Sequence, residues 1–491
     1  MSEVALNGAS LLSAADWADN IRLKKVSSVE ALDYHVRRAE KINPEINAIV
    51  VQDLEVARSR ALAADEATAR GESWGPLHGV PMTVKESFDV AGLPTTWGVS
   101  GLRNHRACED ASAVAALKRA GAVIFGKTNV PTLLADWQTF NSIYGTTCNP
   151  WDLTRTPGGS SGGAAAALAT GLTPLELGSD IGASVRNPAH YCGVYGHKPS
   201  FGIVPQAGHC IPGAEVPLDI LVCGPLARSP TDLAKALQII VGPEPENVPY
   251  WAVRLPEPPI RSLKDARIAV WLEDSVCKVD KTVQDLIRAA VTAASNAGAM
   301  VDDSARPAFD SVEEHSLYLQ LLRGATGAIL SDEAFEHQVQ QLQGLSDRDD
   351  SYLARTLRGV AQSHRDWFLA HQRRAQLRRK WREFFENFDI ILCPTAATAA
   401  FPHDQKRDRA MRTIMVNGKE ESYNDQLFWA GLASLAYLPA TVAPIGMTAS
   451  GLPVGVQIIG AYLNDRTTIE FARLLELEIG GFKSPPAYAS I

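Results

Sequence analysis

The spacing of hydrophobic positions divides this chain into a helical start and a longer mixed region. Across residues 11–70 the pattern is helical. Ser27 and Glu30 form a capping box, which predicts a helix that ends before Asn43-Pro44. A second helix is predicted over residues 54–69, with its charged side chains facing solvent. The pattern therefore predicts an N-terminal helical segment, residues 1–70.

From residue 75 onwards, short β-branched runs alternate with helical stretches. Strands are predicted over residues 80–84, 123–125 and 174–177, and helices over residues 111–120 and 162–170. Alternation of this kind is typical of βαβ units. It predicts an α/β fold, with a largely parallel or mixed sheet and helices on both faces.

The second half of the chain continues this architecture with two interruptions. Residues 242–264 are rich in proline and acidic groups, which predicts an excursion over the surface. Residues 312–388 are helical and highly charged, and we expect them to cover one side of the sheet. Strands return over residues 266–271, 390–394, 440–445 and 451–460. We therefore expect one large domain, residues 1–491, with its core over residues 75–230.

Composition narrows the classes of function. The chain has 491 residues and a formal net charge of −8. This acidic balance argues against nucleic-acid binding, which favours a basic face. The seven cysteines include no C-x-x-C pair, which argues against a zinc ribbon or a dithiol redox site. Cys192, Cys223 and Cys393 lie in apolar runs and are expected to be buried and reduced.

Two further features predict a cytoplasmic location. The start of the chain, Met1–Val4, has no basic segment followed by an apolar stretch, so no secretory signal is expected there. No run approaches the roughly 20 apolar residues that span a bilayer. We expect no contact with membranes.

The candidate chemistry lies in two glycine-rich turns, residues 157–163 and 178–187, which contain Ser160 and Ser184. A serine hydroxyl needs a base to become a nucleophile, and its reaction needs donors for the developing oxyanion. Small residues beside Ser184 let main-chain N–H groups approach a substrate carbonyl. The candidate oxyanion hole consists of the N–H groups of Ile181, Gly182, Ala183 and Ser184.

A candidate base lies upstream. Lys85 follows the apolar run 80–84, so we expect it to leave a buried strand. Burial lowers the pKa of a lysine because it disfavours the charged form. A neutral Lys85 would accept a proton from Ser160, which would accept one from Ser184. The same relay in reverse would protonate a leaving amine.

These motifs resemble the amidase signature family of serine hydrolases. The resemblance rests on residues 158–163, 178–186 and 188–193, and on flanking segments at 126–129, 145–152, 197–202 and 455–460. It implies a mixed, mostly parallel sheet of about eleven strands surrounded by helices. It also implies that Ser184 is the nucleophile, Ser160 the bridging serine after a cis peptide bond, and Lys85 the base.

The resemblance has further implications. The family cleaves the C–N bond of carboxamides without a metal or cofactor, and its members often form homodimers. Substrate contacts are expected at Gly159, Ser161, Trp137 and Asp180, although Asp180 and Arg186 more readily explain how the loop is held. The helices of residues 312–388 are expected to shape the substrate entrance.

The chain departs from the family pattern at two points. Ala183 replaces the usual glycine before the nucleophile, so its methyl group is expected to narrow the acyl side of the site. The segment 130–134 lacks an acidic residue often present there.

Two motifs suggest other functions. Residues 158–162 match G-x-S-x-G, the nucleophile elbow of α/β-hydrolases, which would make Ser160 the nucleophile with a histidine from among His190, His197 and His209. That interpretation leaves Lys85 and the second serine turn without a role. Residues 121–128 match the phosphate-loop pattern, but their apolar middle predicts a strand instead of a flexible turn.

The sequence therefore favours an amidase acting on a small-molecule amide, aryl amide or carbamate through an acyl-enzyme. The alternative is the glutamine-hydrolysing subunit of a tRNA-dependent amidotransferase, which uses the same site. A non-catalytic scaffold would leave the two serines and the lysine unexplained.

Overall fold

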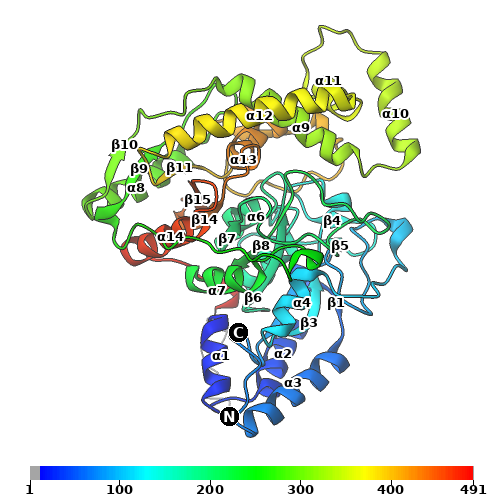
Figure 1. Ribbon diagram of the computed structural model, residues 1–491, viewed down its shortest axis with the longest axis vertical. Coiled ribbons are helices and arrows are strands. Elements are labelled where there is room, and N and C mark those ends of the chain that lie inside the picture. The colour runs from blue at the N-terminus through cyan, green and yellow to red at the C-terminus, as the bar shows by residue number, and fades with distance from the viewer. Residues whose placement is uncertain (1–11, 490–491) are drawn as a thin grey trace.

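A computed structural model describes residues 12–489, so the expectation for Met1–Val4 lies outside the described residues. One eleven-stranded sheet crosses the molecule in the order β1-β3-β2-β6-β8-β7-β14-β15-β11-β9-β10. Helices α9–α12 gather at one end of the molecule and α1–α3 at the other (Figure 1). Two small hairpins, β4-β5 and β12-β13, lie apart from this sheet.

The strands of the main sheet are short and mostly buried. Their bounds are β1 (Ile49–Gln52), β2 (Pro81–Lys85), β3 (Val123–Thr128), β6 (Leu175–Asp180), β7 (Tyr195–Lys198), β8 (Val222–Ala227), β9 (Arg267–Val270), β10 (Met300–Asp302), β11 (Ile390–Pro394), β14 (Ala440–Met447) and β15 (Pro453–Gly460). The hairpins are β4 (Phe140–Asn141) with β5 (Gly145–Thr146), and β12 (Thr413–Val416) with β13 (Lys419–Ser422).

The expected mixed sheet of eleven strands is confirmed. Parallel pairs join β2 to β3 and β6, and β9 to β10 and β11. The strands between these groups pair antiparallel, as does β1 at the edge. The sheet thus contains more antiparallel pairing than the expectation of a mostly parallel sheet.

The helices cover the sheet and build the ends of the molecule. Their bounds are α1 (Ala14–Arg22), α2 (Ser28–Ile46), α3 (Leu54–Ala69), α4 (Ser112–Arg119), α5 (Gly162–Ala169), α6 (Arg186–Cys192), α7 (Pro230–Ile240), α8 (Lys281–Asn296), α9 (Ser311–Gly327), α10 (Asp332–Gln343), α11 (Tyr352–Val360), α12 (His364–Phe384), α13 (Leu427–Ser434) and α14 (Asp465–Ile479). Short 3-10 helices near the site are η4 (Thr132–Leu134), η7 (Arg409–Met411) and η8 (Tyr423–Gln426).

Two local predictions in the N-terminal segment are wrong. The predicted capping box of Ser27 is present, but α2 continues past Pro44 to Ile46. Asn43 stabilises this ending, because its side-chain oxygen accepts the N–H groups of Ala48 and Ile49. The segment also contains strand β1, which pairs with the edge of β3 and was not expected among helices.

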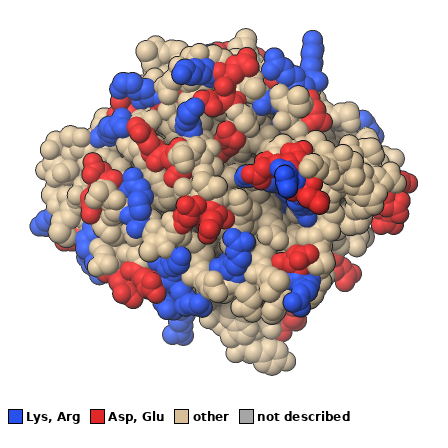
Figure 2. All heavy atoms as spheres, turned by 90° about the horizontal axis from the view of Figure 1, so that it is seen from above, with Lys and Arg blue, Asp and Glu red and all other residues tan. Residues whose placement is uncertain are grey.

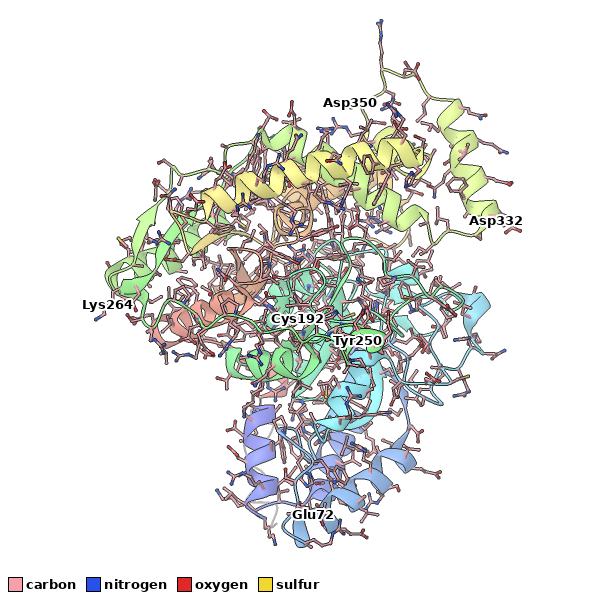
Figure 3. All side chains as sticks on the ribbon, viewed as in Figure 1. Glu72, Cys192, Tyr250, Lys264, Asp332 and Asp350 are labelled. Atoms are coloured by element: carbon pink, nitrogen blue, oxygen red, sulfur yellow. The ribbon has the colours of Figure 1, made fainter. Side chains whose placement is uncertain are left out.

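The core buries whole helices, including the polar side chains of α6. Helices α5, α6 and α13 are buried along their whole length. Cys192, Cys223 and Cys393 are buried free cysteines, as expected, and Figure 3 shows Cys192 in the middle of the molecule. Within the predicted excursion over residues 242–264, Tyr250 is 82% exposed.

The surface carries charges of both signs. Figure 2 shows lysine and arginine interspersed with aspartate and glutamate over the face seen from above. Within residues 12–489, no helix combines the length and apolar character that crossing a bilayer requires.

Candidate active site

Lys85 ends strand β2 in the parallel part of the sheet, between β3 and β6. Its side chain is fully buried, and its Nζ donates to Ser160 Oγ at 2.6 Å and to Ser179 Oγ at 2.9 Å. Burial lowers the pKa of Lys85 to about 7, an effect that the nearby Asp180 partly opposes. A neutral amine is therefore accessible at physiological pH.

Ser160 lies in the turn before α5, directly after the cis peptide bond Gly159-Ser160. Glycine is required at position 159, because a Cβ there would come within 2.3 Å of the carbonyl oxygen of Asp136. The next residue, Ser161, donates its N–H to the Ser184 carbonyl at 3.0 Å. This bond joins the two serine turns that the sequence singled out.

The second serine turn follows β6, and its four carbonyl groups are all held by the surrounding fold. Ile181 O accepts the Tyr318 hydroxyl at 3.0 Å, and Gly182 O accepts the Trp137 indole N–H at 2.8 Å. The carbonyls of the next two residues accept the main-chain N–H groups of Asn187, at 2.7 Å, and Ser161, at 3.0 Å. These bonds fix the orientation of the peptide planes in the turn.

The N–H groups of the turn divide into two sets. The Ala183 N–H donates to Asp180 Oδ1 at 3.0 Å, so it stabilises the loop and is not available to a substrate oxygen. Within the described part of the chain, the N–H groups of Ile181, Gly182 and Ser184 have no acceptor. Gly182 and Ser184 also line the main cavity. Three of the four candidate oxyanion donors are therefore free to meet a substrate oxygen.

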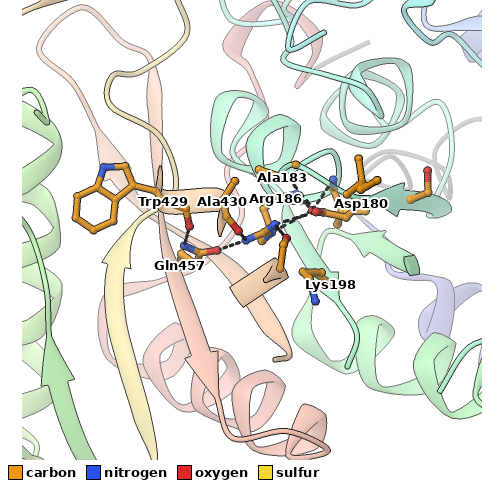
Figure 4. Close-up of polar contacts among 12 residues, drawn as sticks. Asp180, Ala183, Arg186, Lys198, Trp429, Ala430 and Gln457 are labelled. Carbon is orange, nitrogen blue, oxygen red and sulfur yellow. Dashed lines mark hydrogen bonds and ion pairs between the residues drawn. The ribbon is translucent and has the colours of Figure 1, made fainter. Parts of the chain in front are cut away.

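A buried ion pair holds this turn from below (Figure 4). Arg186 donates to both carboxylate oxygens of Asp180, with Nη2 to Oδ1 at 2.8 Å and Nε to Oδ2 at 3.0 Å. Burial would raise the pKa of Asp180, but the charge of Arg186 and the hydrogen bonds lower it below its usual value. Arg186 is itself held by Gln457 and Ser434. This geometry agrees with a structural role for Asp180.

Ser184 lies at the wall of a cavity of about 540 Å³. The Ser184 side chain is nearly buried, and its hydroxyl has no hydrogen bond with another described residue. The cavity wall is mostly apolar and comes from α9, α10 and α11 together with the loops near η4 and η7. Its apolar members include Trp97, Leu133, Trp137, Leu322, Leu330 and Leu357.

The structure separates the predicted substrate contacts. Of the four, Trp137 lines the cavity, beside Trp97, which was not among the predicted contacts. Gly159, Ser161 and Asp180 lie behind the turns and are not among the residues that line it. Asp136 does line it, two positions beyond the segment 130–134 that lacks an acidic residue.

The three histidines that the elbow motif suggested form hydrogen bonds with residues other than the two serines. His190 bonds to the carbonyls of Gly455 and Thr398, His197 to Thr441 and Asp465, and His209 to Ser87. Within residues 12–489 no histidine bonds to Ser160. The phosphate-loop pattern of residues 121–128 is strand β3, as its apolar middle predicted.

Sequence reasoning missed the contributions of Tyr318 and of the arginines in the cavity wall. Tyr318 lies 137 residues from the carbonyl that it holds, in a charged helical stretch with no recognisable motif. The polar residues Arg323, Tyr352 and Arg409 also line the cavity. Only the folded chain brings these positions beside the serine turns.

The α/β fold and the two serine turns are those of a hydrolase. Comparison with known proteins identifies its family. The sequence profile of the amidase family matches residues 30–469. The chain therefore belongs to the amidase family. This confirms the resemblance to the amidase signature family that the sequence motifs showed.

Relatives and solved structures give the same result. The chain is 30% identical to a glutamyl-tRNA(Gln) amidotransferase subunit of Synechococcus sp. (strain CC9605), over 98% of this chain and 99% of that protein. It is 32% identical to the corresponding subunit from Roseiflexus sp. (strain RS-1), over 93% of this chain and 94% of that protein. A bacterial aryl acylamidase of the amidase signature family superposes with a TM-score of 0.80 at 26% identity, covering 99% of this chain and 98% of that one.

Proposed function

We propose that this amidase family hydrolase cleaves a carboxamide C–N bond through an acyl-enzyme on Ser184. The observation that supports this most strongly is the buried hydrogen bond from Lys85 to Ser160, next to the turn that carries Ser184.

In the first step, neutral Lys85 accepts the proton of Ser160 while Ser160 accepts that of Ser184. The Ser184 oxygen attacks the amide carbonyl and forms a tetrahedral intermediate. Its oxyanion accepts hydrogen bonds from the N–H groups of Ile181, Gly182 and Ser184. Donors held in place before the reaction lower the barrier because they need no reorganisation, and each is worth about 10²–10³ in kcat.

In the second step, the relay runs in reverse. Protonated Lys85 returns a proton through Ser160 to the leaving nitrogen, the C–N bond breaks, and ammonia or an amine departs. Water then attacks the acyl-enzyme, with the same relay accepting its proton. The carboxylic acid leaves and Ser184 regains its hydroxyl.

The cavity supports an amide with an apolar or aromatic portion. Its wall is dominated by leucine, isoleucine, valine and tryptophan side chains, and apolar surface buried there is worth about 25 cal/mol per Å². The similarity to the aryl acylamidase structure supports the same choice. We infer that aryl amides, and carbamates of similar shape, are preferred over short aliphatic amides.

A second candidate is a glutamine-hydrolysing subunit of a tRNA-dependent amidotransferase. It is favoured by the 30–32% identity to the glutamyl-tRNA(Gln) amidotransferase relatives over almost the whole chain. Glutamine has only two methylene groups between its amide and the α-carbon that bears its charged groups, so it would contact little of the apolar wall. Glutaminase activity that rises with a co-purifying protein would favour this candidate.

The first test is intact-mass analysis and peptide mapping after treatment with a fluorophosphonate. We expect one adduct, on Ser184, which Ser184→Ala abolishes. Ser160→Ala should slow labelling without moving the adduct. An adduct on Ser160 would instead support the elbow interpretation. The expected homodimer remains a proposal that light scattering after gel filtration would check.

A further inference from the structure

Two arginines in the cavity wall lack a carboxylate partner. Arg323 extends from α9 and Arg409 from η7. Within the described residues, neither guanidinium forms an ion pair with a carboxylate. Arginines that face an apolar cavity usually have such a partner, because an uncompensated charge away from water is costly.

Their hydrogen bonds leave several donors free. Arg323 Nη2 donates to the Tyr352 hydroxyl, while its buried Nε has no acceptor. Arg409 Nη1 donates to the Ala135 carbonyl and its Nε to Asn424 Oδ1 at 3.3 Å. Among the described residues no hydrogen bond involves Arg323 Nη1 or Arg409 Nη2, so each guanidinium keeps N–H groups available to a ligand.

The wall carboxylates form no direct ion pair with these two arginines among the described residues, although, against the effect of burial, the charge of Asp136 helps to raise the pKa of Arg409. Asp136 is engaged by Arg412, whose Nη1 lies 2.5 Å from its Oδ2, and by the Tyr423 hydroxyl at 2.6 Å. Asp408 is exposed and accepts the Ala410 N–H at 2.8 Å. The remaining titratable side chain of the wall besides tyrosine is His337, from α10.

The lowered pKa of Tyr352 shows that the two arginines create a positive electrostatic potential around it. The guanidinium of Arg323 lies 5.5 Å from the centre of the Tyr352 ring. Burial would raise the pKa of the Tyr352 phenol, yet the charges of Arg323 and Arg409 lower it below its usual value. The same field that favours a phenolate favours a bound anion.

We propose that Arg323 and Arg409 form a carboxylate subsite in this cavity, so that the preferred substrate is an amide with an apolar or aromatic body that bears a carboxylate away from the scissile bond. This proposal rests on the amidase function proposed above. The planar guanidinium donates to a carboxylate in a two-pronged geometry, and the apolar wall holds the body between the subsite and Ser184.

The test uses matched amides that differ only in charge. One pair is 4-(butanoylamino)benzoate and N-(4-methylphenyl)butanamide, with the charge on the amine side. The other is glutaryl anilide and pentanoyl anilide, with the charge on the acyl side. For one pair we expect kcat/KM to be about tenfold or more higher for the carboxylate, the effect typical of a charged hydrogen bond.

Variants assign that preference to the subsite. Arg323→Gln should bring the charged-to-neutral ratio close to one, and Arg323→Lys should restore part of it. Arg355→Gln is the matched control, since Arg355 lies on the adjacent helix α11, pairs with Asp350 at 2.7 Å and does not line the cavity. It should keep the wild-type ratio. Fluorophosphonate labelling of Ser184 shows that each variant has an assembled site.

The labelling and kinetic results distinguish a wrong subsite proposal from a wrong amidase proposal. If Ser184 is labelled and neutral amides are cleaved as well as their charged partners, the carboxylate subsite is wrong and the amidase stands. An unchanged ratio in Arg323→Gln would also overturn the subsite. If Ser184 takes no adduct and no amide is cleaved, both proposals fall.

Discussion

The protonation state of one residue, Lys85, is expected to control the pH dependence of the reaction. The pKa of Lys85 is lowered to about 7, chiefly by burial. Below that pH the amine is protonated and cannot accept a proton, so kcat/KM should rise with pH through about 7 and then level off. Lys85→Arg stays protonated and should be inactive at every pH. A kcat/KM that rises without a break through pH 10 would contradict Lys85 as the base.

A second residue, Ala183, has a backbone conformation that favours glycine. Its φ is +71°, in the left-handed region, where a side chain costs about 1–2 kcal/mol. Ala183→Gly keeps the N–H that bonds Asp180, so activity should persist and stability should change by less than about 1 kcal/mol. Ala183→Val places a β-branched side chain there and should destabilise the protein and lower kcat. Thermal unfolding and steady-state kinetics of both variants check this. Equal stability and equal kcat in Ala183→Gly and Ala183→Val would contradict it.

At this scale the proposed reacting groups have a clearer signal in the sequence than the groups that hold them. Ser160, Ser184 and Lys85 lie in short motifs, so their identity can be read locally. Tyr318 and Arg409 reach the site from distant segments and have no local signal. Even within the motif, the sequence could not show that the Ala183 N–H is used by Asp180.

At the scale of elements, helix α9 supports the serine turn through one hydroxyl. Tyr318→Phe removes the donor to the Ile181 carbonyl and leaves the turn freer to move. We expect kcat to fall roughly tenfold to a hundredfold, because small misplacements of reacting groups are costly. The rate of fluorophosphonate labelling at Ser184 should fall in parallel.

The control for that variant removes a comparable hydroxyl elsewhere. Tyr195 is buried on β7 and donates to Glu476 at 3.0 Å. Tyr195→Phe should cost similar stability, about 1 kcal/mol, with kcat unchanged. If both variants lower kcat equally, the loss reflects general destabilisation and α9 has no special role.

Element predictions succeed where burial and periodicity agree. The predicted strand 390–394 coincides with β11, and the helix at 54–69 with α3. They fail where tertiary contacts outweigh local preference. The helix through Pro44 is completed by the Asn43 side chain, and β1 exists because the edge of β3 offers it a partner.

At the scale of the whole molecule, the order of the strands lies beyond local patterns. Neighbours such as β7 and β14 are separated by more than two hundred residues, and no turn specifies their pairing. The family resemblance supplied the eleven-stranded sheet, whereas periodicity alone gave only the α/β class. The division of the chain into one domain with helical additions stays a prediction.

Stability of the whole fold should depend on a buried acid on α9, one turn before Tyr318. Glu314 on α9 is 3% exposed, and neither of its carboxyl oxygens has a hydrogen-bond partner among residues 12–489. Burial raises the pKa of Glu314 to about 8, with a smaller contribution from Asp274. The folded protein thus keeps this proton to a higher pH than the unfolded chain does.

Between the ordinary pKa of 4.5 and about 8, unfolding therefore releases a proton from Glu314, and the free energy of unfolding falls as pH rises. Glu314→Gln removes this linkage. Its stability relative to wild type should grow by on the order of 1 kcal/mol per pH unit across this window. Denaturant unfolding at pH 5, 6.5 and 8 measures the difference. Glu313→Gln, at an exposed neighbouring position, should show a constant difference. A Glu314→Gln difference that stays constant with pH would mean that the carboxyl is already ionised in the folded protein.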